Sequence, residues 1–204
     1  GVKELYGCEH TVMPDRIAAV TYMAAAAVTG GNVTLLDVDN THILPMLAPF
    51  EQSGCSVRQL GSALNIMAPP RLNAVRHIRT MPYPGFPTDA QPVVMSMAAV
   101  GRGTSIFVEN IFENRHKHAE GLERLGAKIK VEGKVAIVEG VERLQGAPVI
   151  SQDLRGGAAL VVAGLAAEGR TQVGGVEHIR RGYEDLAGSL ADLGARIREV
   201  DDLS

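Results

Sequence analysis

One pattern recurs three times along the chain and constrains its fold more than any other feature. Each copy has an aspartate, an apolar run rich in alanine and valine, a glycine, a β-branched stretch, an amphipathic segment and a second glycine. The aspartate and the first glycine are 16, 14 and 16 residues apart, and the two glycines are 23, 23 and 25 apart. Such self-similarity is typical of a domain built from copies of one supersecondary unit. The copies begin at Asp15, Asp89 and Asp153, and their glycine pairs are Gly31 and Gly54, Gly103 and Gly126, and Gly169 and Gly194.

The residues between these markers predict a helix, a strand, a second helix and a hairpin in each copy. The second glycine follows the last apolar position of an amphipathic segment, where a left-handed residue ends a helix at little steric cost. Alternating runs across a short turn predict hairpins over residues 56–67 and 128–139. In the third copy ARIREV, residues 195–200, should form the first hairpin strand, but no return strand follows. That copy is either degenerate or completed by a strand from elsewhere in a longer polypeptide.

The apolar runs also indicate how the units are arranged. The first helix of each copy is apolar nearly all round, which suits an interior position, whereas the second helices of the last two copies carry charges on one side. With no tryptophan and only 4% aromatic residues, the core consists of small side chains that let helices approach closely. We therefore predict one α/β domain over residues 1–204 with pseudo-threefold symmetry, in units of about 11–80, 81–147 and 148–204. An ordinary α/β sandwich with the same elements is the alternative.

Composition excludes several classes of function. A net charge of -3 gives no general attraction to nucleic acid or to an anionic membrane. No apolar run approaches the roughly 20 residues of a membrane helix, and GVKELYGCEH lacks a signal pattern, so we expect a cytoplasmic protein. Cys8 and Cys55 offer neither a disulfide framework nor metal-ligand spacing with the six histidines. We expect no metal site.

Asp89 stands out among the three aspartates. An aspartate before an apolar helix is most often an N-cap, and for Asp15 this interpretation suffices. Asp89 differs because Pro84 and Pro87 stiffen the YPGFPTD segment and Gly85 permits a sharp bend in it. That stiffness either positions a side chain for chemistry or simply shapes a loop.

Three groups of arginines occur near predicted helix starts. Arg115 lies in IFENRHKH, Arg155 lies in the first turn predicted for DLRGG, and Arg180 and Arg181 are expected to open the last helix in EHIRRGYE. Guanidinium groups bind phosphate and carboxylate bidentately, so three such groups suit an anionic substrate. Each arginine could instead be a solvated surface charge, and HKH after Arg115 could be an exposed polar run. No Walker loop, GxGxxG or Ser/His/Asp constellation occurs in a convincing context.

Five strings in order make the sequence similar to a known family. MPDRI, FPTDAQ, IFENR, DLRGGAALVVAG and HIRRGYE closely resemble UDP-N-acetylglucosamine 1-carboxyvinyltransferases, members of the enolpyruvyl transferase family. The resemblance spans essentially the whole chain but only about the C-terminal half of that family's sequence. It implies an inside-out α/β barrel of three repeated units, paired with an N-terminal domain across the active-site cleft.

The resemblance also implies a reaction and roles for particular residues. Enolpyruvate would be transferred from phosphoenolpyruvate to the 3-hydroxyl of UDP-N-acetylglucosamine, without metal or cofactor, through a tetrahedral intermediate. Asp89 would contact the sugar hydroxyl as a base, and Ile111 would lie against the nucleotide-sugar. Asp153 would support the arginines or cap its helix. The arginines expected to neutralise phosphate and carboxylate groups are Arg115, Arg155 and Arg181.

The chain departs from the family pattern in two respects. Arg180 stands where the family usually has an acid, which favours a change in local ion pairing. The family's N-terminal lysine-asparagine pair and the loop acid, a cysteine or aspartate, belong to segments outside this sequence, and neither cysteine here matches that acid. We therefore expect the chain alone to be nearly inactive. The alternatives are a 5-enolpyruvylshikimate 3-phosphate synthase-like enzyme and a non-catalytic barrel that serves as a partner subunit.

Overall fold

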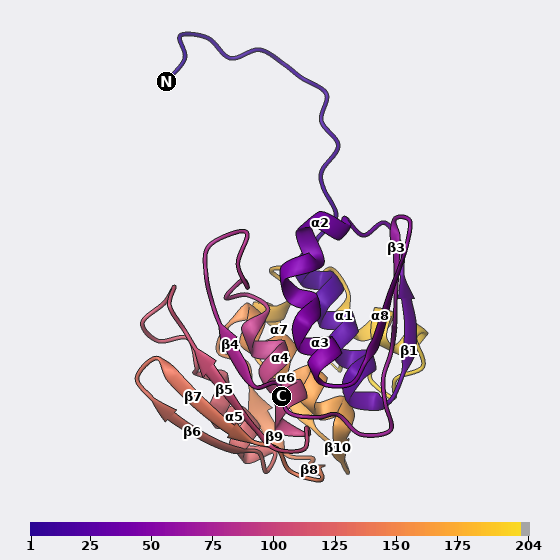
Figure 1. The fold of residues 1–204 in the computed structure, drawn as a ribbon, viewed down its shortest axis with the longest axis vertical. Coiled ribbons are helices and arrows are strands. Elements are labelled where there is room, and N and C mark those ends of the chain that lie inside the picture. Colours follow the sequence, from indigo (N-terminus) through magenta and orange to yellow (C-terminus); the bar gives the residue numbers. More distant parts are fainter. Residues whose placement is uncertain (201–204) are drawn as a thin grey trace.

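Three alanine-rich helices occupy the middle of the protein, and small sheets and shorter helices surround them (Figure 1). The structure is a computed structural model that describes residues 1–200; residues 201–204, which the predicted third unit includes, lie outside that range. The three helices pack against one another, and in α4 every residue is buried. The predicted interior position of the first helices is therefore confirmed. They are α1 (Arg16–Thr29), α4 (Gln91–Ala99) and α6 (Leu154–Ala166).

The first unit follows the predicted order, but its second helix is broken. One helix was expected over residues 43–53; a 3-10 turn over residues 44–46 and a separate six-residue helix form there instead. Pro45, which has no backbone N–H, is the second residue of the 3-10 turn. The predicted hairpin is confirmed, and its strands form a three-stranded sheet in the order β1-β3-β2. The elements are β1 (Asn32–Leu35), α2 (Asn40–Ile43), η1 (Leu44–Met46), α3 (Leu47–Gln52), β2 (Ser56–Leu60) and β3 (Ala63–Met67).

The second unit builds a four-stranded sheet in the order β4-β5-β7-β6, and the first of these strands comes from residues 77–79, which were expected to belong to the first unit. Its hairpin is also confirmed: β6 and β7 pair antiparallel across a turn at Gly133, whose φ is 58°. At the other edge β4 joins β5 in parallel. The elements are β4 (His77–Arg79), β5 (Thr104–Val108), α5 (His118–Arg124), β6 (Lys128–Glu132) and β7 (Val135–Glu139).

The third unit contains no hairpin within the described residues. The strand predicted over residues 195–200 does not form, so that prediction is wrong. A strand needs a neighbour for its N–H and C=O groups, and within residues 1–200 none pairs with this segment. The elements around α6 are β8 (Leu144–Gln145), β9 (Pro148–Ile150), β10 (Ala167–Glu168), β11 (Gln172–Gly174), α7 (Val176–Ile179) and α8 (Leu186–Asp192).

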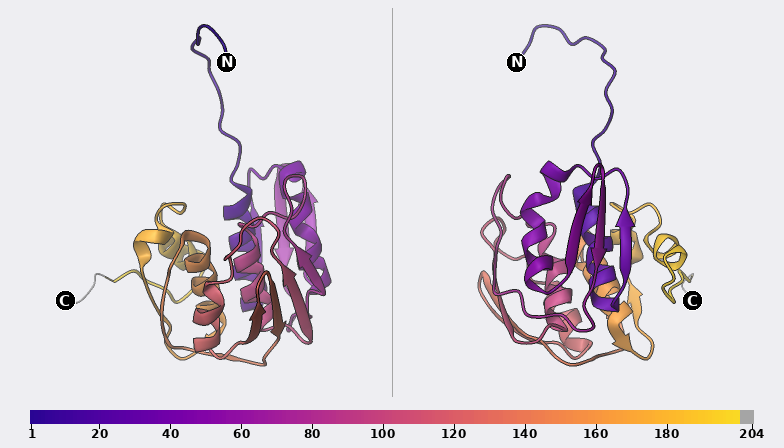
Figure 2. Two further views of the ribbon diagram at one scale, coloured as in Figure 1. Left: turned by 90° about the vertical axis from the view of Figure 1, so that its left-hand side faces the viewer. Right: turned by 45° about the vertical axis from the view of Figure 1, so that its right-hand side comes forward.

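A short strand before the central helix is a feature that the sequence pattern did not indicate. β4 precedes α4 and pairs in parallel with β5, and β9 precedes α6 and pairs in parallel with β11. Each is a strand-helix-strand crossover, so the loops after both paired strands lie at the same sheet edge. In the first unit the corresponding residues, 1–15, are exposed and extend away from the body (Figures 1 and 2). No helix in the described part of the chain combines the length and apolar character needed to cross a membrane.

Gly140 lets the β4-β5-β7-β6 sheet approach the end of α4, and a substitution at this position tests the contact. A Cβ at position 140 would lie 1.6 Å from the carbonyl oxygen of Gly101, whereas one at Gly174 would come no nearer than 3.9 Å to any neighbour. Because backbone cannot give way cheaply, Gly140→Ala should lower the free energy of unfolding by about 3 kcal/mol. Gly174→Ala should change it by less than about 1 kcal/mol. Urea denaturation followed by circular dichroism measures both; equal stability of the two variants would contradict this packing.

Candidate active site

Three loops meet at the end of the molecule where the central helices α4 and α6 begin. The loop between β4 and α4 carries Asp89, the loop between β5 and α5 carries Arg115, and the short link between β9 and α6 leads to Arg155. Parallel pairing of β4 with β5 brings the first two loops side by side, because both follow carboxyl ends of strands at one sheet edge. The third loop lies beside them because α6, which follows it, packs against α4.

The three aspartates that begin the sequence repeats have different partners. Asp15 accepts hydrogen bonds from two N–H groups of α1 at 2.7 and 3.1 Å, and Asp153 accepts two from α6 at 3.0 and 2.8 Å. Both are N-caps. Asp89 caps nothing: α4 starts after Ala90 without a side-chain cap. Its carboxylate is therefore available for other partners.

The bend before Asp89 is held by its own backbone. The Met81 N–H donates to the Phe86 carbonyl at 2.9 Å, and the Gly85 N–H donates to Pro82 at 2.8 Å. A Cβ on Gly85 would lie 2.5 Å from the Cβ of Met81, so only glycine fits this turn. The sharp bend expected at Gly85 is present.

Two arginines form ion pairs with the Asp89 carboxylate. Arg115 donates from Nη2 to Oδ1 at 2.9 Å, and Arg155 donates from Nε to Oδ2 at 3.2 Å. The arginine side chains are 16% and 14% exposed and the aspartate side chain is 41% exposed, so the cluster opens to solvent at the carboxylate. One negative and two positive groups leave a positive charge uncompensated within the trio. Such a cluster suits an anionic ligand.

Tyr183 supports Arg155 and had no role in the sequence-based prediction. The guanidinium of Arg155 lies over the tyrosine ring at 5.8 Å and donates from Nη1 to the hydroxyl at 3.4 Å. That hydroxyl also lies 2.7 Å from Oγ1 of Thr21 in α1. Burial raises the pKa of Tyr183, so its hydroxyl stays protonated and keeps its hydrogen-bonding role. The only signal in the sequence was its position in HIRRGYE, two residues after Arg181.

Arg181, the third predicted arginine, is exposed and makes no hydrogen bond or ion pair within residues 1–200. It lies between α7 and α8 instead of opening the last helix. The neighbouring Gly182 packs against Leu154, since a Cβ there would lie 2.8 Å from Leu154 Cδ2. The segment is thus beside the start of α6, but Arg181 does not join the cluster in this structure. Arg180 is exposed too and pairs with Glu199.

Apolar side chains border the cluster on the β5–α5 loop. Ile111 is 38% exposed and Phe112 is 50% exposed. The guanidinium of Arg115 lies 5.5 Å from the centre of the Phe112 ring. The loop therefore presents an apolar surface directly beside a charged one, which suits a ligand with both kinds of group.

The histidines after Arg115 are not an exposed polar run. His116 and His118 are buried, and only Lys117 between them is exposed. Burial lowers the pKa of His116, and burial followed by the proximity of His116 lowers the pKa of His118 to about 3. Both rings are neutral near pH 7, so the interpretation as a surface run was wrong. They anchor the start of α5 behind the site.

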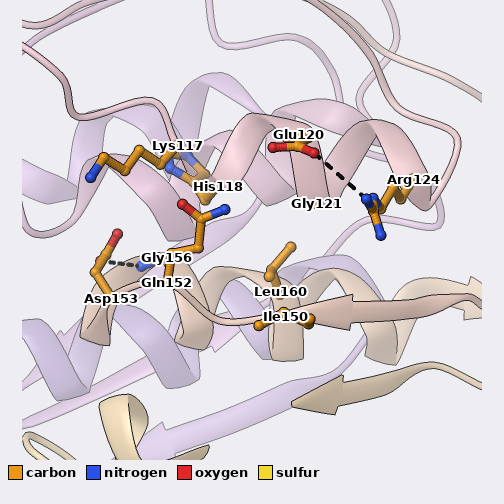
Figure 3. Close-up of a pocket in the computed structure, with 10 residues that line it drawn as sticks. All are labelled: Lys117, His118, Glu120, Gly121, Arg124, Ile150, Gln152, Asp153, Gly156 and Leu160. Atoms are coloured by element: carbon orange, nitrogen blue, oxygen red, sulfur yellow. Dashed lines mark hydrogen bonds and ion pairs between the residues drawn. The ribbon is translucent and has the colours of Figure 1, made fainter. Parts of the chain in front are cut away.

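A cavity of about 160 Å³ lies between α5 and the start of α6 (Figure 3). Figure 3 shows Lys117 on the α5 side of this cavity and Gln152 and Asp153 on the α6 side. Asp89, Arg115 and Arg155 do not line this cavity. No group of three residues suited to hold a metal ion occurs within residues 1–200.

Several known proteins are similar to this chain in sequence. Residues 1–190 match the family model of EPSP synthase (3-phosphoshikimate 1-carboxyvinyltransferase). UDP-N-acetylglucosamine 1-carboxyvinyltransferase 2 of Caldanaerobacter subterraneus subsp. tengcongensis is 49% identical over 98% of this chain and 48% of its own length. A protein of Desulfofundulus thermocisternus with the same enzyme name is 52% identical over 97% of this chain and 81% of its own length. The chain spans about half the length of most of the curated relatives that it matches.

Solved structures share the fold. The enolpyruvyl transferase NikO from Streptomyces tendae has a TM-score of 0.80 and 28% identity, covering 93% of this chain and 45% of its own. EPSP synthase from Acinetobacter baumannii has a TM-score of 0.73 at 20% identity, covering 93% and 47%. These matches and the family model show that the chain belongs to the EPSP synthase family of enolpyruvyl transferases. Within that family, the relatives at about half identity are named UDP-N-acetylglucosamine 1-carboxyvinyltransferase, so the resemblance found in the sequence is confirmed.

Proposed function

We propose that this chain is one half of an enolpyruvyl transferase that uses phosphoenolpyruvate and UDP-N-acetylglucosamine. The observation that carries the proposal is the Asp89 carboxylate held between Arg115 and Arg155 beside an apolar loop. A base and an anion site within one cluster are the two functions that such a transfer requires. The reaction is the first committed step of peptidoglycan synthesis.

The proposed architecture is an inside-out α/β barrel of three repeated units with pseudo-threefold symmetry. Packing of α1, α4 and α6 against one another, with the sheets outside them, supports this interpretation. The repeated pairing of a leading strand with the strand after the central helix supports it for the second and third units.

In the proposed reaction Asp89 acts on the acceptor. A carboxylate has about four lone-pair directions, and the two arginines occupy only two of them in this cluster. The remaining ones can accept a hydrogen bond from the sugar 3-hydroxyl and take its proton as the oxygen attacks C2 of phosphoenolpyruvate. Ile111 would lie against the nucleotide-sugar, where its exposed apolar surface excludes water.

The arginines act on the donor. Addition to C2, with protonation of C3, gives a tetrahedral intermediate that carries a carboxylate and a phosphate. Loss of phosphate from C2 together with a proton from C3 then restores the double bond. Arg115 and Arg155 supply the uncompensated positive charge, and Arg181 would approach when the substrate and the second domain close the site. Asp153, which caps α6, holds Arg155 at the start of that helix.

The second domain is a proposed partner, since most of the relatives are about twice as long as this chain. It would supply the other wall of the cleft and the acid that protonates C3 of phosphoenolpyruvate. We propose no role for nucleic acid, membrane, metal or cofactor.

Reconstitution tests this function. This chain, mixed with the N-terminal half of the Caldanaerobacter relative, should release phosphate from phosphoenolpyruvate only when UDP-N-acetylglucosamine is present. Mass spectrometry should detect the enolpyruvyl product. The chain alone should bind the nucleotide-sugar weakly in calorimetry, with a Kd of about 1 mM or above, because half of the contacts are missing.

Each half alone is the control, and shikimate 3-phosphate is the competing acceptor. The family model carries the name of the shikimate enzyme, so this second acceptor is a specific alternative. Phosphate release with shikimate 3-phosphate but not with the nucleotide-sugar would show that shikimate 3-phosphate is the acceptor. No release with either acceptor from two folded halves would refute both.

A further inference from the structure

We infer that Glu109 is a positioning residue that sets the distance between the loop of Asp89 and the loop of Arg115. Glu109 directly follows β5 and is 1% exposed, although it is a carboxylic acid. Buried carboxylates persist where their lone pairs are satisfied and their removal would leave other polar groups without partners. The inference rests on the proposed function only for its effect on catalysis.

One oxygen of Glu109 shapes its own loop. Oε1 accepts the backbone N–H groups of Ile111 at 2.8 Å and Phe112 at 3.1 Å. These bonds fold the chain back immediately after the strand and fix the exposed side chains of both residues. The same turn determines where the following segment delivers Arg115.

The other oxygen of Glu109 reaches the loop of Asp89. Oε2 accepts a hydrogen bond from Oγ1 of Thr88 at 3.0 Å, and Thr88 is the residue immediately before Asp89. The carboxylate therefore joins the two loops at the level of the site. Thr88 and Glu109 are 21 positions apart in the sequence, so no local pattern indicates this contact.

A second contact joins the same loops farther from the site. The Asn110 backbone N–H donates to Oγ1 of Thr80 at 2.8 Å, and its side-chain amide donates to the Thr80 carbonyl at 3.2 Å. Thr80 is fully buried. The loop that carries the proline bend is thus attached at its start through Thr80 and at its end through Thr88. Asp89 is consequently placed by the loop after β5 as well as by its own backbone.

The consequence for catalysis is geometric. Asp89 meets Arg115 at 2.9 Å only if both loops keep their relative position, and Glu109 is the buried side chain that joins them next to Asp89. A displacement of about 1 Å at a reacting group can cost about a hundredfold in rate. Glu109 contributes without touching substrate, by acting through Thr88 and the backbone of Ile111.

The test uses Thr88→Val, which keeps the shape but removes the hydroxyl, and Thr88→Ser, which keeps the hydroxyl. In the reconstituted pair Thr88→Val should lower kcat about tenfold, as expected for one hydrogen bond to a charged group, and change KM less than threefold. Thr88→Ser should stay within threefold of the unmodified pair. Glu109→Ala should lower kcat at least as much, and adding Thr88→Val to it should cause little further loss. Thr104→Val, at an exposed threonine of β5, is the matched control.

Amide hydrogen exchange on this chain alone gives a readout that does not depend on activity. Glu109→Ala should speed exchange at Ile111 and Phe112 about tenfold or more, and Thr88→Val should speed it at Met81, while Thr104→Val changes neither. Unchanged exchange at these amides together with unchanged kcat in Thr88→Val would overturn the inference. If the unmodified pair transfers no enolpyruvate, the proposed function fails, and hydrogen exchange still tests the link between the loops.

Discussion

Asp89→Asn should lower enolpyruvyl transfer by the reconstituted pair at least about a thousandfold, within the range for loss of a general base. Asparagine keeps the size of the side chain but replaces one oxygen with a nitrogen that donates hydrogen bonds. That nitrogen would face either Arg115 or Arg155, both of which are donors. The variant therefore loses the base, both ion pairs and one of the two hydrogen bonds from the arginines. Phosphate release with saturating substrates measures the effect.

Asp15→Asn is the matched control, because Asp15 occupies the equivalent place in the first unit but only caps α1. Asparagine is an equally good N-cap, so this variant should keep both stability and transfer. Thermal unfolding of both variants separates a folding defect from a chemical one. Because the Asp89 side chain is 41% exposed, its ion pairs should add only about 1 kcal/mol to the free energy of unfolding. A folded Asp89→Asn pair with unchanged transfer would remove this residue from the chemistry.

Local sequence predicted the parts of the fold that local forces determine. The alanine-rich helices α1, α4 and α6 and the two hairpins follow from apolar periodicity, capping residues and glycines. β4 and β9 were missed because each has only three residues, and a strand so short is stabilised by a partner far along the chain. The strand expected over residues 195–200 does not form although its alternating pattern is present, because no strand within residues 1–200 pairs with it.

The sequence predicted the parts of the site that depend on neighbouring residues, and it missed the parts that depend on contacts between distant ones. The proline-braced bend indicated Asp89, but its contacts with Arg115 and Arg155 depend on packing between residues that are 26 and 66 positions apart in the sequence. The sequence did not indicate a role for Tyr183, because its hydroxyl contacts Thr21, which is 162 positions away in the chain. The histidines beside Arg115 looked like a surface run by composition, yet the start of α5 packs inward and buries both. Arg181 remains a prediction for the closed, two-domain enzyme.

Arg155→Lys should lower kcat/KM for phosphoenolpyruvate about a hundredfold or more, although it keeps the positive charge. Arg155 binds Asp89 through Nε and Tyr183 through Nη1, and its planar group lies over the tyrosine ring. A lysine has one ammonium group and cannot make these contacts and bind substrate at the same time. Loss of one positioned donor to a transition-state anion typically costs a hundred- to a thousandfold.

Arg180→Lys is the control for this substitution. Arg180 is exposed and pairs with Glu199 at the surface, so the variant should transfer enolpyruvate at an unchanged rate. The intrinsic fluorescence of Tyr183 cannot be isolated among four tyrosines, so NMR of its ring is the better structural check. The ring signals should shift in Arg155→Lys, as the guanidinium leaves its face, and should not shift in Arg180→Lys. If Arg155→Lys shifts the ring signals but keeps kcat/KM within threefold, then Arg155 serves the fold and the anion site lies elsewhere on the cleft.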